Sequence, residues 1–171
     1  MRILKTLGVA VALAAVGLAV GAASASADLE EGPFHGTQIH GTFTGALNLA
    51  CEGHFEGVVE DGSWPQPDLH ITPVEFYDCD PPCAVNVATP VDAHADQSGA
   101  VTLEDVAVTI HCPGMGEIPF DGPAIQGQWD CQDEGELAFA NQVFFVGGVP
   151  AATWDAEWHI EGLHLDGKEC V

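Results

Sequence analysis

The stretch that decides the fold runs from Val106 to Gly122 and reads Val-Ala-Val-Thr-Ile-His-Cys-Pro-Gly-Met-Gly-Glu-Ile-Pro-Phe-Asp-Gly. As far as Cys112, apolar residues alternate with small or polar ones, which is the period of a β-strand with one buried face. The Pro-Gly-Met-Gly segment that follows has the composition of a turn, and a short return strand comes after it. The stretch therefore predicts a β-hairpin with a cysteine beside its turn.

An earlier segment, Leu47 to Gly57, resembles this hairpin in its order of residue types. Cys51 follows an alternating run, Gly53 comes two residues later, and Phe55-Glu56-Gly57 matches Phe120-Asp121-Gly122. We interpret both segments as a strand, a cysteine, a glycine turn and a return strand. The two segments would then mark two related halves of one domain.

The first 27 residues have the features of a secretory signal peptide. Arg2 and Lys5 give a positive start, an apolar run extends from Leu7 to Val20, and Ala25-Ser26-Ala27 is a small-residue cleavage site. The apolar run is shorter than the ~20 residues of a membrane span. We therefore expect cleavage after Ala27 and secretion of a single mature β domain, residues 28–171, with no membrane span.

The mature chain is strongly acidic. One lysine, Lys168, stands against 26 Asp and Glu residues, which gives a net charge of −25 with neutral histidines. Because phosphate backbones are held mainly by Lys and Arg, nucleic-acid binding is not expected. A cationic partner or a metal ion is compatible with this charge, and so is plain solubility outside the cell.

All six cysteines follow the signal segment: Cys51, Cys79, Cys83, Cys112, Cys131 and Cys170. An even number in an exported chain predicts three disulfides. We favour Cys51–Cys79, Cys112–Cys131 and Cys83–Cys170, because the first two link a strand end to the next cysteine-bearing segment. A local Cys79–Cys83 bridge is the main alternative. The three residues between Cys79 and Cys83 do not match the Cys-x-x-Cys spacing of thiolate metal sites.

No helical periodicity follows the signal segment, and roughly nine or ten strand-like runs are separated by Gly, Pro or acidic turns. This pattern predicts an all-β fold, a single disulfide-stapled antiparallel β-sandwich or barrel. We expect Thr37 to Ala50 to form either a long strand or a hairpin broken near Gly45. We also expect an edge or bulged strand at Pro73 and two short strands separated by Pro90. A bulge is expected at Glu104-Asp105, and residues 28–35 are expected to be a loose, acidic start.

Four motifs carry a family resemblance: Leu49-x-Cys51-x-Gly53, Val74-x-Phe76-x-x-Cys79, Gly99-x-Val101-Thr102-Leu103 and Val108-x-Ile110-x-Cys112. In these positions the chain resembles a diffuse group of small exported β proteins of Gram-positive bacteria. The resemblance implies the fold and export, and it implies no particular activity. Cys83 and Cys170 are additions to the pattern of that group.

The best local candidate for a metal site is Asp92-Ala-His94-Ala-Asp96. In a strand, its two carboxylates and its imidazole share one face, and such ligands suit zinc or another divalent ion. The alternative is an ordinary exposed strand face, because side chains about 7 Å apart converge on one ion only with help from another strand. A divalent metal is the one cofactor that the sequence indicates.

The segment Trp154 to Glu161 alternates without a break between apolar and polar residues. Trp154 and Trp158 share one face, and acidic residues and a histidine share the other. One interpretation places the tryptophans in the core. The other exposes them, with Trp64, as a platform for carbohydrate, with two carboxylates as a catalytic pair.

Other catalytic routes have little support. The mature chain has two serines, Ser63 and Ser98, and neither lies in a Gly-x-Ser-x-Gly elbow. The first hypothesis is therefore a non-enzymatic exported binding, interaction or surface protein. The second is a divalent-metal-binding protein or metal-dependent hydrolase that uses Asp92, His94 and Asp96.

Overall fold

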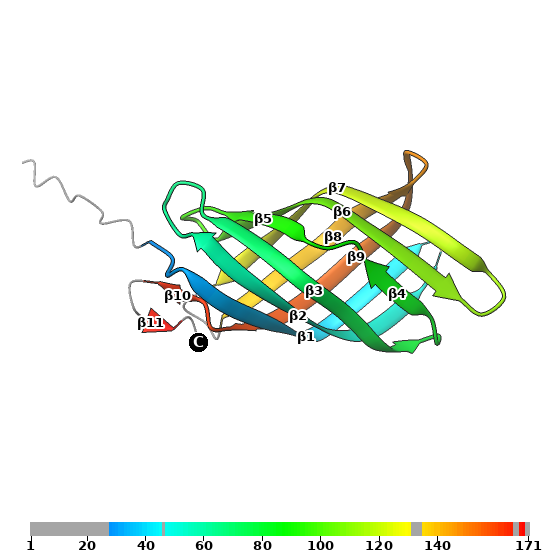
Figure 1. The fold of residues 1–171 in the computed structure, drawn as a ribbon. Coiled ribbons are helices and arrows are strands. Elements are labelled where there is room, and N and C mark those ends of the chain that lie inside the picture. The colour runs from blue at the N-terminus through cyan, green and yellow to red at the C-terminus, as the bar shows by residue number, and fades with distance from the viewer. Residues whose placement is uncertain (1–27, 46, 131–134, 166–167, 170–171) are drawn as a thin grey trace, which may run out of the picture.

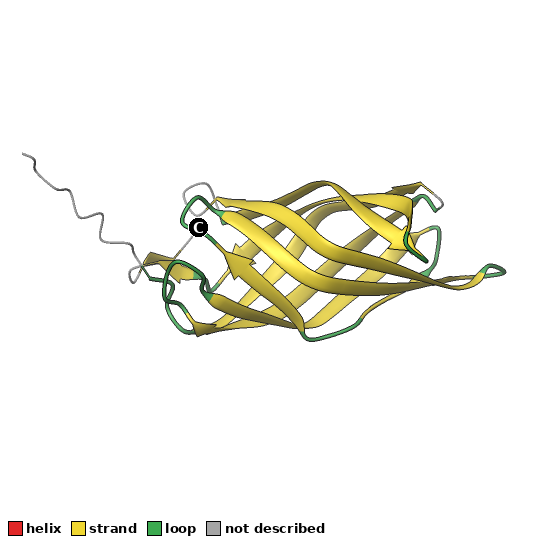
Figure 2. Cartoon of the chain, turned by 90° about the horizontal axis from the view of Figure 1, so that it is seen from above, coloured by secondary structure: helices red, strands yellow, loops and turns green. Residues whose placement is uncertain are grey.

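The computed structural model describes residues 28–45, 47–130, 135–165 and 168–169, so the predicted signal peptide lies outside the described residues. The described chain consists of strands, turns and loops, with no helix (Figure 2). The all-β prediction is therefore confirmed. It follows that this part of the chain holds no helix with the length and hydrophobicity of a membrane-spanning segment.

The long strands have the following bounds: β1 Gly32–Gly45, β2 Leu49–Asp61, β3 Asp68–Asp80, β6 Ala100–Cys112, β7 Gly116–Asp130, β8 Glu136–Val146 and β9 Val149–Glu161. The short ones are β4 Ala84–Val87, β5 Val91–Ala95, β10 His164–Leu165 and β11 Lys168–Glu169. The breaks after Gly45 and at Pro90 fall where the sequence predicts them.

Strands β1 to β9 form one antiparallel sheet that closes on itself as an eight-stranded barrel (Figure 1). Strand β6 pairs with β7, β7 with β8, and β8 with β9. Strand β1 closes the barrel by pairing with both β2 and β9. The short strands β4 and β5 share one position in the wall, between β3 and β6. Closure leaves no free sheet edge along most of the wall, which distinguishes a barrel from a sandwich.

The hairpin predicted from Val106 to Gly122 is confirmed. Strands β6 and β7 pair from Ala100↔Gln128 to Cys112↔Gly116, and Gly114 and Gly116 in the connection have positive φ angles of 85° and 74°. Glycine adopts this conformation without the steric cost that a side chain brings. The turn between β6 and β7 lies at the right-hand end of the barrel in Figure 1.

The proposed earlier copy of this hairpin is wrong. Strand β2 continues from Leu49 to Asp61 without a turn at Cys51 or Gly53. Gly53 serves a different purpose: a Cβ atom there would lie 2.7 Å from the Gln38 side-chain oxygen and 3.1 Å from the Phe76 ring. The glycine makes room for side chains inside the barrel, so this segment does not repeat the β6–β7 hairpin.

Two disulfides lie in the described chain, and one confirms a predicted pair. Cys51 on β2 bonds Cys79 on β3, with a Cα–Cα distance of 4.0 Å. Cys83 forms a disulfide with Cys112, with a Cα–Cα distance of 4.3 Å. The predicted pairs Cys112–Cys131 and Cys83–Cys170 are therefore wrong. The reason is register: Ala84 lies opposite His111, so the preceding and following residues meet at the next position of the β4–β6 ladder. Cys131 and Cys170 lie outside the described residues.

The structure also tests the predictions made for Pro73 and for residues 28–35. The register of β2 and β3 shifts between Phe55↔Val74 and Gly57↔Ile71, so β3 is bulged at Pro73 as predicted. Residues 28–35 are not a loose start, because β1 begins at Gly32. Phe34 enters the core beside the Phe55 ring, 6.0 Å away between ring centroids, and this apolar contact fixes the segment.

Candidate functional site

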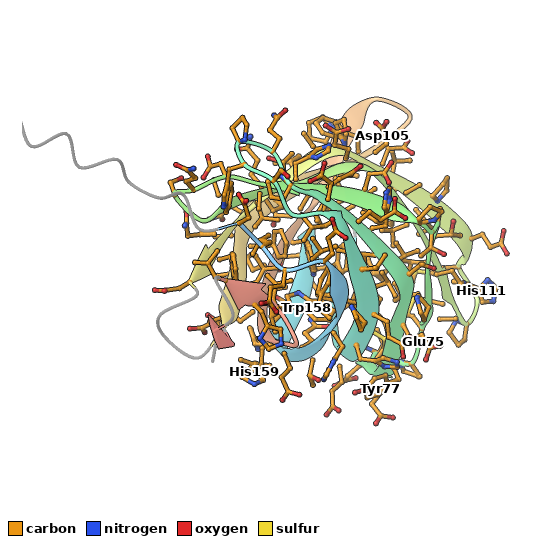
Figure 3. All side chains as sticks on the ribbon, turned by 60° about the vertical axis from the view of Figure 1, so that its left-hand side comes forward. Glu75, Tyr77, Asp105, His111, Trp158 and His159 are labelled. Atoms are coloured by element: carbon orange, nitrogen blue, oxygen red, sulfur yellow. A yellow bond between two sulfur atoms is a disulfide. The ribbon has the colours of Figure 1, made fainter. Side chains whose placement is uncertain are left out.

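The interior of the barrel is formed by the apolar faces of the strands. On β9, Trp154 and Trp158 are 7% and 2% exposed and point inward, and Figure 3 shows Trp158 within the barrel while His159 projects outward. The period-2 pattern of the sequence thus places the tryptophans in the core, as the first interpretation expects. They do not form an exposed platform for carbohydrate. Trp64, in the loop before β3, is half-buried against the same core.

A cavity of about 60 Å³ lies inside the barrel. All of its lining residues are apolar: Phe43, Phe55, Ile71, Val74, Phe76, Val87, Val91, Leu103, Val106, Val108, Leu137, Phe139, Phe144, Trp154 and Trp158. A second apolar cavity of about 40 Å³ shares Phe55, Ile71, Leu103 and Leu137 with the first. Eight-stranded barrels are just wide enough for side chains to fill the interior or to leave space for one small ligand.

The wall beside the main cavity is weakest between β3 and β4. Strand β3 pairs with β5 from Asp68↔His94 to Ile71↔Val91, but its pairing with β4 consists of Glu75↔Asn86. We call this line the β3–β4 seam. Three lining side chains at the seam, Val74, Phe76 and Val87, are half-buried rather than buried. The cavity therefore reaches the barrel wall at this seam.

The two disulfides lie on either side of the seam without crossing it. Cys51–Cys79 ties β3 to β2, and Cys83–Cys112 ties the start of β4 to β6. Each side of the seam is covalently held to the strand behind it. Neither disulfide therefore holds β3 to β4 across the seam.

Sequence reasoning missed one interior residue, Gln38, which is the buried polar side chain of the described chain at 8% exposure. A signal was present, because Gln38 continues the inward register of Phe34 and Gly36 on β1. A single amide in an alternating strand, however, forms none of the charged or aromatic clusters that mark a site in a sequence.

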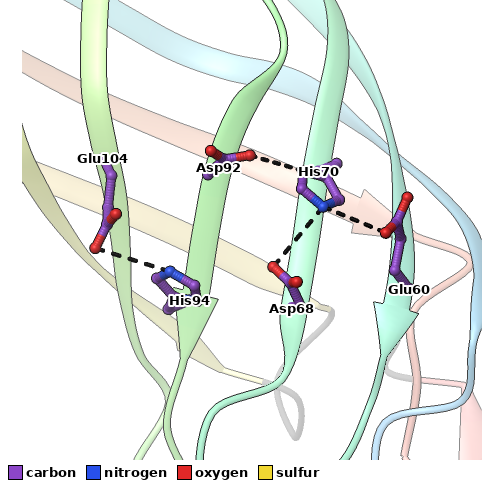
Figure 4. A network of polar contacts seen from close by, with 6 residues as sticks. All are labelled: Glu60, Asp68, His70, Asp92, His94 and Glu104. Carbon is purple, nitrogen blue, oxygen red and sulfur yellow. Dashed lines mark hydrogen bonds and ion pairs between the residues drawn. The ribbon is translucent and has the colours of Figure 1, made fainter.

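The predicted metal ligands lie on the outer face of the barrel and each has a different partner. Asp92 accepts a hydrogen bond from His70 Nδ1 at 2.7 Å, and His94 lies 3.8 Å from Glu104 (Figure 4). Asp96 accepts hydrogen bonds from the backbone N–H groups of the following turn, Ser98 at 2.7 Å and Ala100 at 3.1 Å. Strand geometry keeps the three side chains apart.

No group of three or more His, Cys, Asp and Glu side chains suited to a metal ion occurs in the part of the chain that the structure describes. The metal-site hypothesis stays a prediction, and elemental analysis of protein purified from its native host would test it. Stoichiometric zinc, copper or manganese would support it.

The outer face instead brings together a histidine and three carboxylates. His70 lies 2.7 Å from Asp92, 3.5 Å from Glu60 and 3.8 Å from Asp68. The hydrogen bond to Asp92, together with these negative charges, raises the pKa of His70 above its ordinary value of 6.5 against a smaller opposing effect of burial. His70 also borders an open hollow of about 490 Å³ over β1 to β3.

Hydrogen bonds in turns have the opposite effect on two exposed aspartates. The hydrogen bonds from Ser98 hold the pKa of Asp96 below its ordinary value, and those from Ser63 do the same for Asp61. Both carboxylates stabilise loops, because they satisfy backbone N–H groups that the strands leave unpaired.

Comparison with known proteins adds no further constraint. No protein-family model, no curated protein and no solved structure matches this chain. A functional proposal therefore rests on the interior, the seam and the outer surface described above.

Proposed function

We propose that residues 28–171 form an exported, non-enzymatic binding protein that holds a small apolar ligand inside the barrel. The observation that carries this proposal is the main cavity, whose lining consists of aliphatic and aromatic side chains alone. Such a surface binds by excluding water and by dispersion contacts. It offers no acid, base or nucleophile to a bound molecule, which favours binding over catalysis.

The volume of the cavity limits the size of the ligand. A space of about 60 Å³ is less than half of the roughly 150 Å³ of an engineered apolar cavity that binds benzene. A ligand of about five non-hydrogen atoms would therefore fit only if lining side chains moved aside. A longer aliphatic chain would reach the second cavity if the four shared side chains, which include Phe55 and Leu103, moved aside.

The β3–β4 seam supplies a route into the cavity. Parting β3 from β4 breaks the pairing at Glu75↔Asn86, whereas parting β6 from β7 would break a ladder that runs from Ala100 to Cys112. Because each lost backbone hydrogen bond costs free energy, opening at the seam is much easier. Half-exposed Val74, Phe76 and Val87 would provide the first apolar contacts for an entering molecule.

The first test is binding of n-pentane to the isotope-labelled mature protein, followed through the indole N–H signals in NMR spectra. The four tryptophans give few signals, and two of these residues, Trp154 and Trp158, line the cavity. We expect saturable shifts of the Trp154 and Trp158 signals. Wild-type protein that shows no saturable shift with n-pentane would overturn the proposed function.

A matched pair of variants locates the binding. Val108→Phe places a ring in the cavity, and Thr109→Phe places the same ring on the opposite face of β6. We expect Val108→Phe to abolish n-pentane binding and Thr109→Phe to retain it. Melting curves of both variants show whether each is folded, because overpacking typically costs about 1–3 kcal/mol.

A second pair of variants tests the route of entry. Glu75→Cys with Asn86→Cys would cross-link the seam, and His111→Cys with Glu117→Cys would cross-link the fully paired β6–β7 hairpin at another exposed register pair. We expect the first cross-link to slow n-pentane exchange at least about tenfold and the second to leave it unchanged. Equal exchange rates in the two cross-linked proteins would refute entry at the seam. Intact-mass mapping confirms that the native bridges are retained.

A further inference from the structure

Glu75 projects outward at the β3–β4 seam, between two residues whose side chains line the main cavity. On β3, Val74 and Phe76 line the cavity and are half-buried, whereas the Glu75 side chain is 61% exposed. The register partner of Glu75 across the seam is Asn86, which precedes the cavity residue Val87. A molecule that entered the cavity between these strands would therefore pass beside the Glu75 carboxylate.

The one tyrosine of the chain, Tyr77, lies near Glu75 on the outer surface. Alternation along β3 places the two side chains on one face, about 7 Å apart, and Figure 3 shows both on the outside of the barrel. His54, the register partner of Glu75 on β2, lies 3.6 Å from its carboxylate and 6.1 Å from the Tyr77 ring between centroids. Tyr77 is 41% exposed. The seam is thus bordered by a carboxylate and an exposed aromatic ring.

The charge beside the seam is negative. Residues 28–165 contain neither lysine nor arginine, and the register partner of Tyr77 on β2 is a second acid, Glu52, which is also exposed. Carboxylates attract a cation by charge, and an aromatic ring attracts one through its π electrons. The outer border of the seam therefore favours a cation and repels an anion.

The apolar lining of the cavity decides where a charged group of the ligand must lie. Because aliphatic and aromatic side chains form the whole lining, a charge inside would lose its hydration without compensation. The charged end of a ligand therefore stays at the outer surface, while its apolar chain occupies the cavity. At the seam, the exposed groups that meet this charged end include Glu75 and Tyr77.

We infer that the ligand of the barrel is a small alkylammonium ion, whose apolar chain lies in the main cavity and whose ammonium group stays outside, beside Glu75 and Tyr77. This inference rests on the proposed function and adds the charged group of the ligand. A lysine side chain does not suit the same arrangement. Its ammonium group is at the free end, so that the charge would have to enter the cavity first.

The test compares three five-carbon molecules in NMR titrations of the mature protein: pentan-1-amine, which is protonated at neutral pH, pentan-1-ol and pentanoate. We expect the amine to bind about tenfold more tightly than the alcohol, because an exposed ion pair and a cation–π contact each contribute about two- to fivefold. Pentanoate should bind more weakly than the alcohol. The amine should shift the indole signals of Trp154 and Trp158, which report the chain, and the ring signals of Tyr77, which report the ammonium group.

Variants of the outer surface isolate the ammonium site. Glu75→Gln keeps the shape of the side chain, and we expect it to bind pentan-1-amine about fivefold more weakly than wild type and pentan-1-ol equally well. The matched control is Glu157→Gln, which removes an exposed acid from β9, a strand separated from β3 by β1 and β2. It should change the affinity for the amine by less than about twofold, because distant exposed charges are screened. Tyr77→Leu should weaken binding of the amine alone, by about two- to fivefold.

The outcomes separate this inference from the proposed function. The ammonium site is wrong if wild-type protein binds n-pentane and pentan-1-ol but binds pentan-1-amine no more tightly than the alcohol. It is also wrong if Glu75→Gln and Glu157→Gln weaken binding of the amine equally. A shift of the Tyr77 signals without shifts of Trp154 and Trp158 would place the whole amine on the outer surface and overturn the inference. Absence of binding by n-pentane and by all three five-carbon molecules would overturn both the inference and the proposed function.

Discussion

Trp158 and His159 are neighbours on β9, yet they lie on opposite sides of the barrel wall (Figure 3). Inside, Trp158 is 2% exposed and packs on aromatic rings from β2 and β3. Outside, His159 is half-buried and lies 3.3 Å from Glu161. The two faces of one strand therefore contribute to different properties: packing inside, charge outside.

The same division holds around the barrel. The inner face combines stacked and tilted aromatic pairs, such as Phe139 with Trp154 at 5.1 Å, with aliphatic side chains. On the outer face, histidines lie within ion-pair distance of carboxylates, for example His70 with Asp92 and His35 with Glu161. Stability therefore comes from apolar burial on the inner face, while the excess of acids outside opposes folding by mutual repulsion.

The largest expected effect is the loss of an inner ring. Trp158→Ala removes an indole from a closed interior and should destabilise the protein by roughly 3–5 kcal/mol. Glu157→Gln and His159→Gln, on either side of it and facing outward, should each change the free energy of unfolding by less than about 0.5 kcal/mol. Denaturant unfolding of the three variants measures the contrast. Similar values for the three would abolish the distinction between the faces.

The next effect is the loss of the bridge on the inner face. Cys83→Ala combined with Cys112→Ala opens a link between residues separated by 29 positions and should cost roughly 2–4 kcal/mol. Asn86→Ala with Thr109→Ala changes a register pair on the outer face of the same strands and should cost less than about 1 kcal/mol. Thermal and denaturant unfolding compare the two double variants.

A count of free thiols tests the pairing of Cys131 and Cys170, which lie outside the described residues. We expect no free thiol in the mature protein, because all six cysteines follow a predicted export signal and their even number suits an oxidising compartment. With the two observed bridges, full oxidation would leave Cys131 to pair with Cys170. Labelling of two free cysteines in non-reduced protein would contradict the three-bridge prediction.

A smaller effect concerns the repulsion between acids on the outer face. Raising sodium chloride from low concentration to about 0.15 M should increase the melting temperature by roughly 2–4 °C, which corresponds to about 1 kcal/mol. Potassium chloride should act equally, because screening depends on ionic strength. Glu104→Gln, which removes one outer charge, should reduce the dependence on salt. A melting temperature that stays flat or falls with salt would show that the acids do not oppose folding.

The smallest expected effect is the pH dependence of the pair His70 and Asp92. The pKa of His70 in the folded protein is raised above 6.5, so its stabilising contribution is complete below pH 6.5 and is lost as pH rises through the raised value. The stability difference between wild type and His70→Gln should therefore shrink as pH rises from about 6 to 8. NMR titration should give His70 a pKa above 6.5, which Asp92→Asn lowers. A stability difference between wild type and His70→Gln that does not change with pH would contradict a stabilising ion pair between His70 and Asp92.

Much of the fold is visible in the sequence because strand periodicity is local. The alternation in Trp154 to Glu161 predicts which side chains are buried, and Gly45, Pro73 and Pro90 predict the irregularities of the strands. Cys51–Cys79 was also predictable, because β2 and β3 are consecutive and pair directly. Where an inference needed only neighbours in the chain, the structure generally agrees with it. There are three exceptions. The glycine turn assigned at Gly53 is wrong, since a glycine can also make room for another side chain. The loose start assigned to residues 28–35 is wrong, and so is the bulge at Glu104-Asp105, because β6 and β7 pair there without a register shift.

The candidate metal site shows where local reasoning fails. Asp92 and His94 share the outer face of β5, whereas Asp96 lies just after the strand, in the turn. Asp92 pairs with His70 because β3 lies beside β5. The register between two strands, which the sequence of one strand does not contain, decides the partner. The same holds for Cys83–Cys112, which depends on the pairing of β4 with β6.

By itself, the sequence determined that the chain is made of strands, which residues face inward along most of them, and that the charge is acidic. Only the tertiary structure decided that the inner faces close into a barrel, with an apolar cavity and the β3–β4 seam that Glu75 borders. The physical reason is that a two-residue hydrophobic period shows that one face of a strand is buried. It does not show which other strands cover that face. That second fact arises from contacts between strands far apart in the chain.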